Sequence, residues 1–66
     1  MSATGPTVRV ELELGQAEAW ALAEFIKRAL WDDYRRRAIN ELEAQQMRAA
    51  AEAIGRALAE VGVAPR

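Results

Sequence analysis

Residues 24–44 read EFIKRALWDDYRRRAINELEA and join two apolar parts of the chain through a dense block of charge. The block contains neither glycine nor proline, so one long helix through it is conceivable. Asn40, however, is followed three residues later by Glu43, which is the spacing of a helix N-cap with an acid in the first turn. We therefore expect a turn at residues 38–40 between two antiparallel helices, with a single continuous helix as the alternative.

The first helix is expected over residues 15–38, with two apolar stripes at helical spacing. The aliphatic stripe consists of Leu22, Phe25, Ile26, Ala29 and Leu30. The aromatic stripe consists of Trp20, Ala23, Lys27, Trp31, Tyr34 and Ala38. Together the stripes cover more than half of the helix circumference, so this helix needs more than one neighbour. Trp, Tyr and Arg dominate binding hot spots. The candidates on this stripe for a homodimer interface or for docking a partner are Trp20, Lys27, Trp31 and Tyr34.

The second helix is expected over residues 41–61. Its apolar positions follow a 3-4-3-4 spacing, which is typical of a helix-packing seam. The seam begins at Ala44 and continues through Met47, Ala51, Ile54, Leu58 and Val61. Gly62, followed by Val63, predicts a Schellman-type end to this helix.

Residues 7–14, TVRVELEL, alternate apolar and polar side chains and predict a half-buried β-strand. Its apolar side consists of Val8, Val10, Leu12 and Leu14. A lone strand needs a ladder partner, and no second strand pattern exists in the chain, so we expect it to pair with the same strand of a second subunit or with a different protein. The predicted fold is mainly α: an N-terminal strand and a two-helix hairpin in one domain (residues 7–62), with a disordered tail (1–6) and a C-terminal tail (63–66).

Composition limits the chemistry that the protein can perform. The chain has 66 residues, nine basic and ten acidic side chains, and neither cysteine nor histidine. The usual zinc frameworks and nucleophile–base pairs therefore cannot be built, and we predict no enzyme activity, no metal and no cofactor. Glu11 and Glu13 share one side of the expected strand and would bind a hard cation weakly, but solvated carboxylates are the favoured interpretation.

The near-balanced charge does not favour nucleic acid or an anionic membrane as a partner. The N-terminus lacks the features of a signal peptide, and no apolar run approaches the length of a membrane span. We therefore expect a cytoplasmic protein.

Asp33 stands out because it interrupts the aliphatic stripe. Either the stripe ends there in solvent, or Asp33 forms a partly buried salt bridge with Arg36 or Arg37 that fixes the geometry of the subunit or of the helical hairpin. The triplet at residues 35–37 does not form one basic face, because successive helical residues point about 100° apart. We therefore interpret the three arginines as structural rather than as a nucleic-acid patch.

The order strand, helix, helix over residues 7–61 resembles the ribbon-helix-helix family of dimeric DNA-binding repressors and antitoxins. The resemblance implies that paired strands enter the major groove, with Arg9, Glu11 and Glu13 at the outward positions. Two of these residues are acids, which phosphates would repel.

A second resemblance concerns QAEAWALAEFIKR, from Gln16, and ALAEVGVAPR, from Ala57. These segments are similar to short uncharacterised bacterial proteins of integrative or phage-like elements, which implies an accessory or inhibitor role. The leading hypothesis is a small non-enzymatic homodimeric interaction module. The alternative is a ribbon-helix-helix-like DNA-binding regulator or antitoxin.

Overall fold

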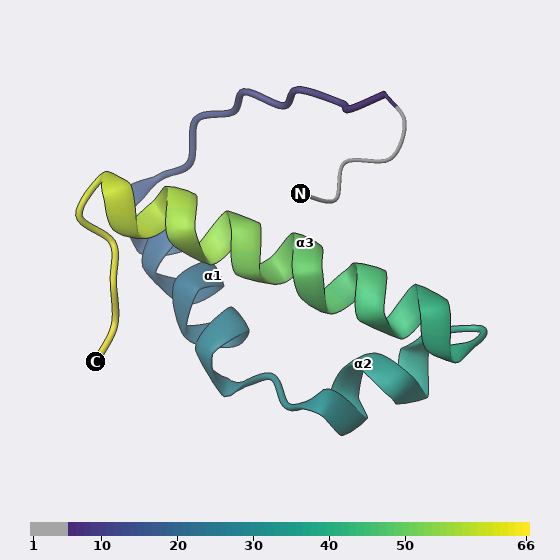
Figure 1. Cartoon of the computed structure of the whole chain (residues 1–66). Helices are drawn as coiled ribbons and strands as arrows, with labels where there is room; N and C mark the ends of the chain where they lie inside the picture. Colours follow the sequence, from purple (N-terminus) through teal and green to yellow (C-terminus); the bar gives the residue numbers. More distant parts are fainter. Residues whose placement is uncertain (1–5) are drawn as a thin grey trace.

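A computed structural model describes residues 6–66 and contains three helices in this range, α1 (Gln16–Arg28), α2 (Trp31–Arg37) and α3 (Glu41–Glu60). Both α1 and α2 pack against α3, the longest helix. Figure 1 shows α1 and α2 on one side of α3, and the segment before α1 on the other side. The three helices therefore form one layer, in which α1 and α2 lie against the same side of α3.

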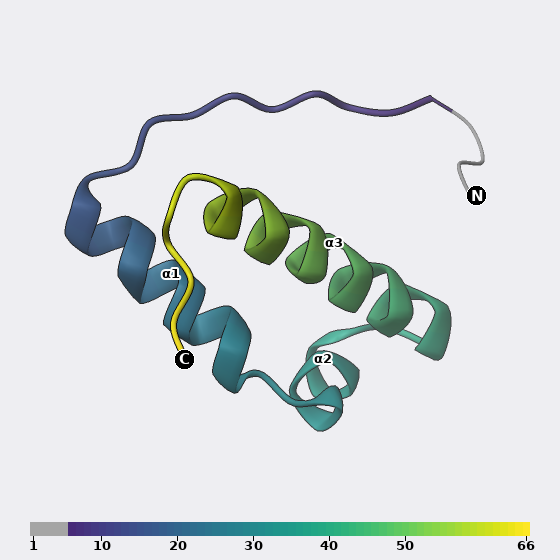
Figure 2. The same cartoon turned by 60° about the vertical axis from the view of Figure 1, so that its left-hand side comes forward.

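The predicted N-terminal strand is wrong. No strand occurs within residues 6–66, and residues 6–15, here called the N-terminal arm, are exposed throughout. The arm runs apart from the helices in both views (Figures 1 and 2). As the alternation predicts, side chains two residues apart lie on the same side of the arm. The Arg9 guanidinium, for example, lies 3.7 Å from the Glu11 carboxylate. The pattern alone supplies no ladder partner, and without one the strand does not form.

The outcome for the terminal segments differs at the two ends. The predicted tail at residues 1–6 falls almost entirely on residues 1–5, which lie outside the described residues. After Gly62 the chain turns back towards α1 (Figures 1 and 2). Val63 and Pro65 are half-buried, so the C-terminal segment is partly packed.

The predicted first helix is interrupted. α1 ends at Arg28, and the next two residues are extended, with φ/ψ of −69°/131° at Ala29 and −107°/168° at Leu30. α2 then begins with Asp32 and Asp33 in its first turn and ends with Arg35, Arg36 and Arg37 in its last turn. This charge order matches the helix dipole of a separate short helix. The sequence predicts one helix here because the apolar periodicity continues through the interruption.

The predicted corner at residues 38–40 is confirmed, and α3 begins directly after it. The Asn40 Oδ1 atom accepts a hydrogen bond from the Glu43 backbone N–H (2.8 Å), and the Glu43 carboxylate accepts one from the Ile39 N–H (2.8 Å). Two backbone donors at the helix start are thus satisfied by side chains from the same four-residue segment.

The predicted Schellman end of α3 is also confirmed. The Val63 N–H donates to the Leu58 carbonyl oxygen (2.9 Å), and the Gly62 N–H donates to that of Ala59 (3.0 Å). Gly62 has φ of 92°, a left-handed conformation that glycine adopts without a steric penalty.

The core is very small. Among the described residues only Ala19, Ala23 and Ala44 are buried, at 9%, 5% and 0% exposure, and no large side chain is fully enclosed. Alanines bury little apolar area, so these contacts stabilise the fold much less than a core of leucine or phenylalanine would.

The α3 seam is rotated relative to the predicted one. Met47, Ala51 and Leu58 are half-buried, whereas Ile54 and Val61 are exposed, at 45% and 75%. Gly55 takes the inward position, and a Cβ atom built on it would lie 3.6 Å from Ile26 Cγ2 of α1. The packed side of α3 therefore includes Gly55 in place of Ile54 and does not extend to Val61.

Replacing Gly55 by alanine is expected to raise the free energy of unfolding by about 0.5–1 kcal/mol. The added methyl group fits, because 3.6 Å is an ordinary van der Waals distance, and alanine costs less backbone entropy in a helix than glycine. Urea unfolding followed by circular dichroism measures the change. As a control, Gly62→Ala should destabilise the chain because of its positive φ. A destabilised Gly55→Ala variant would show that the α1–α3 contact does not tolerate a methyl group.

Candidate functional site

An open groove of about 540 Å³ lies between α1 and α2, and Met47 of α3 also lines it. Its apolar wall consists of Ala21, Phe25, Ala29, Tyr34 and Met47. Its charged rim consists of Glu24, Arg28, Asp33 and Arg37. The groove, here called the α1–α2 groove, exists because the two extended residues after Arg28 turn α2 away from the line of α1.

The rim charges are only partly paired. The Arg28 guanidinium lies 3.2 Å from the Glu24 carboxylate, and the Arg36 guanidinium lies 2.7 Å from that of Asp33. Arg37 has no ion-pair partner within residues 6–66. The rim therefore offers an unpaired positive charge to a ligand with an acidic group.

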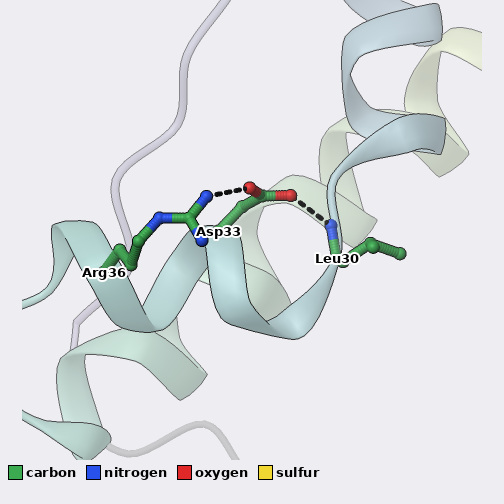
Figure 3. Close-up of polar contacts among 3 residues, drawn as sticks. All are labelled: Leu30, Asp33 and Arg36. Atoms are coloured by element: carbon green, nitrogen blue, oxygen red, sulfur yellow. Dashed lines mark hydrogen bonds and ion pairs between the residues drawn. The ribbon is translucent and has the colours of Figure 1, made fainter.

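Asp33 lies in the first turn of α2. Its contacts decide between the two interpretations of this residue, an end of the apolar stripe in solvent or a partly buried salt bridge. One carboxylate oxygen accepts a hydrogen bond from the Leu30 N–H (2.7 Å), and the other accepts one from Arg36 (2.7 Å), as Figure 3 shows. The Asp33 and Arg36 side chains are 41% and 64% exposed. The pair is thus a solvated cap, with Arg36 rather than Arg37 as the partner.

The same kind of side-chain hydrogen bond occurs at the start of all three helices. An acid at the third helical position accepts a backbone N–H from the residue before the helix or from the residue preceding that one. Glu18 accepts from Gly15 (3.0 Å), Asp33 from Leu30, and Glu43 from Ile39. The spacing from Leu30 to Asp33 is therefore the sequence signal that could have located the start of α2.

Replacing Asp33 by alanine is expected to lower the free energy of unfolding by about 1 kcal/mol, the usual contribution of a helix N-terminal cap. The matched control is Arg36→Ala, which removes only the exposed ion pair and should cost at most about 0.5 kcal/mol. Urea unfolding of both variants separates the contribution of the Leu30 hydrogen bond from that of the Arg36 ion pair. Equal losses for both would mean that the ion pair, and not the Leu30 hydrogen bond, holds this turn.

The predicted docking residues do not form one stripe, because the interruption after Arg28 separates them. The half-buried Trp31 ring faces α3, with the Arg48 Cζ atom 5.4 Å from its centroid. Tyr34 lines the α1–α2 groove. Trp20, 37% exposed, lies at the edge of the buried face of α1, and Lys27 is exposed. Trp31 thus contributes mainly to packing within the chain, and Tyr34 to the groove.

Two residues gain importance only in the structure. Phe25 is expected on a packed stripe but is 67% exposed at the groove wall. Arg48 is exposed, and its guanidinium also lies over the Trp31 ring. No local pattern distinguishes these positions, because the direction of α2 decides both.

Large apolar side chains are exposed on the N-terminal arm, on α1, in the segments on both sides of α2, and along and just after α3. They are Val8, Val10, Leu12, Leu14, Trp20, Phe25, Leu30, Ile39, Leu42, Ile54 and Val61. The predicted strand face belongs to this set in full, with exposures from 38% at Leu14 to 87% at Val8.

The described residues contain no group of three or more metal-binding side chains, and Glu11 and Glu13 lie on the exposed arm. Among the same residues, no helix has the length and apolar character required to cross a membrane. The features that remain as a candidate site are the α1–α2 groove and the exposed apolar side chains.

Comparison with known proteins gives a family but no activity. Residues 1–66 match the model of a family of unknown function, DUF7706. No curated protein and no solved structure matches the sequence. The chain therefore belongs to the family of unknown function DUF7706, as one of its small helical members.

Proposed function

We propose that the protein is a small non-enzymatic interaction module that works as a homodimer. The observation that supports this proposal is the imbalance between its core and its surface. Three alanines are buried in the described part of the chain, while eleven large apolar side chains are exposed. A fold with so small a core gains the burial that it lacks by association.

The surface area points in the same direction. The chain exposes 5750 Å², whereas a compact protein of 7.3 kDa exposes about 4,200 Å². The radius of gyration is 12.9 Å, against about 10.8 Å expected for a compact chain of this length. A standard interface buries about 800 Å² on each partner, so the excess surface, about 1,600 Å², is large enough for one.

Two features favour interaction over catalysis or DNA binding. The sequence has neither histidine nor cysteine from which to build a nucleophile–base pair. The ribbon-helix-helix alternative requires a strand before the first helix, and residues 6–15 contain none. Within this proposal, the cytoplasm is the expected compartment, and an accessory role in a bacterial mobile element is the expected context.

Sedimentation equilibrium tests the proposal directly. We expect a dimer at micromolar concentrations of the full chain, and a melting temperature that rises with protein concentration because association stabilises the folded state. A gel-shift assay with its own promoter region at low salt tests the DNA-binding alternative. A folded monomer at all micromolar concentrations, with a concentration-independent melting temperature, would refute the homodimer.

A further inference from the structure

We propose, building on the homodimer above, that the N-terminal arm of each copy lies in the α1–α2 groove of the other copy. One contact would then cover two features that the single chain leaves unpartnered. The arm carries four exposed apolar side chains. The groove has a volume of about 540 Å³ and an apolar wall. Reciprocal exchange of the arms gives a closed two-fold dimer.

The arm does not occupy its own groove. In both views the arm runs on one side of α3, and α2 lies on the opposite side (Figures 1 and 2). Val10 and Leu12 are 69% and 64% exposed, which shows that nothing within the described chain covers them. A second copy is the occupant that supplies the same arm from outside.

The dimensions of arm and groove agree. Along an extended chain, Val10, Leu12 and Leu14 point to one side and span about 13 Å. The α1 side of the groove runs from Ala21 to Arg28, a distance of about 10 Å along a helix. Three successive apolar side chains of the arm therefore match the length of the wall.

The charges are complementary as well. The arm carries Glu11 and Glu13 against Arg9, whereas α2 carries three arginines against two aspartates. Arg9 is paired with Glu11 within the arm. Glu13 and the rim residue Arg37 have no ion-pair partner within residues 6–66, so each copy offers one charge that the other can pair.

Cysteine cross-linking tests the proposal cleanly because the chain has no cysteine of its own. A full chain with Val10→Cys, Leu12→Cys or Leu14→Cys is mixed with a tagged full chain carrying Ala21→Cys in the groove, and the mixture is oxidised. The matched control is Ala53→Cys, since Ala21 and Ala53 are both exposed helical alanines and only Ala21 lines the groove. We expect a mixed disulfide with Ala21→Cys for at least one arm position, and none above background with Ala53→Cys.

A second measurement separates this proposal from the homodimer itself. Leu12→Asp removes one apolar contact of the arm and should weaken the dimer roughly ten- to hundredfold, as followed by sedimentation. Helix content should stay unchanged, because Leu12 is 64% exposed in the single chain. If the wild-type chain is a monomer, both proposals fail; if it is a dimer that Leu12→Asp does not weaken, only the exchanged arm fails.

The cross-linking pattern also identifies other occupants. Arm-to-arm disulfides without arm-to-groove disulfides would overturn the proposal in favour of paired arms. A chain that carries both Leu12→Cys and Ala21→Cys distinguishes exchange from closure within one chain: excess cysteine-free protein should suppress its cross-link. A cross-link that survives this dilution would place the arm in its own groove and would overturn the exchange.

Discussion

Replacing Ala44 by aspartate is expected to leave the chain largely unfolded at 25 °C and neutral pH. Ala44 is fully buried, at 0% exposure, where α3 packs against the rest of the chain. An unpaired carboxylate at such a position costs several kcal/mol. A domain of this size has a total stability of only about 3–10 kcal/mol, so one buried charge removes most of it.

The measurement is helix content by far-ultraviolet circular dichroism, and the control is Ala53→Asp on the exposed side of α3. Ala44 lies near the start of α3, where the helix dipole favours an acid, whereas Ala53 lies further along the helix. The helix dipole alone would therefore make Ala44→Asp less destabilising than Ala53→Asp, whereas burial makes Ala44→Asp the more destabilising of the two. Comparable stability of the two variants would show that Ala44 is not a core residue.

Replacing Trp31 by alanine is expected to lower the free energy of unfolding by about 1.5–2.5 kcal/mol, around half of the loss for a fully buried tryptophan. The half-buried indole links α2 to α3, and the Arg48 guanidinium lies 5.4 Å from its centroid. α2 has only seven residues and is too short to be stable without tertiary contacts. We therefore expect α2 to unfold in this variant.

Two further substitutions divide this effect into its parts. Arg48→Gln removes only the cation and should cost about 0.5–1 kcal/mol, and Trp31→Phe keeps an aromatic surface and should cost less than Trp31→Ala. Urea unfolding measures all three variants. If Trp31→Ala costs no more than Arg48→Gln, the ring contributes nothing beyond the cation contact, and the packing role of Trp31 is wrong.

The features that the sequence predicted correctly are local. The Asn40–Glu43 cap and the Gly62–Val63 end of α3 depend on hydrogen bonds between residues that are three to five positions apart. Such contacts form in the same way whatever surrounds the helix, so composition and spacing are sufficient to locate them.

The interruption at residues 29–30 has a local signal in the sequence, but the apolar periodicity conceals it. The Leu30–Asp33 cap that starts α2 is also local, but the apolar periodicity continues through it and predicts one helix. For the candidate site, Tyr34 was predicted as a docking residue and Met47 as a residue of the helix-packing seam, and both line the groove. Phe25 was assigned to a packed stripe because periodicity does not reveal how far α2 turns away from α1.

By itself, the sequence determined where α3 begins and ends and how its backbone groups are satisfied, because those interactions close within a few residues. The tertiary structure alone decided that Gly55 rather than Ile54 meets α1, that Trp31 meets Arg48, and that residues 7–14 form no strand in a single chain. These outcomes depend on which apolar surfaces find a partner across the fold. With only three alanines buried among residues 6–66, the fold has too few packing partners to cover the apolar residues that the sequence pattern provides.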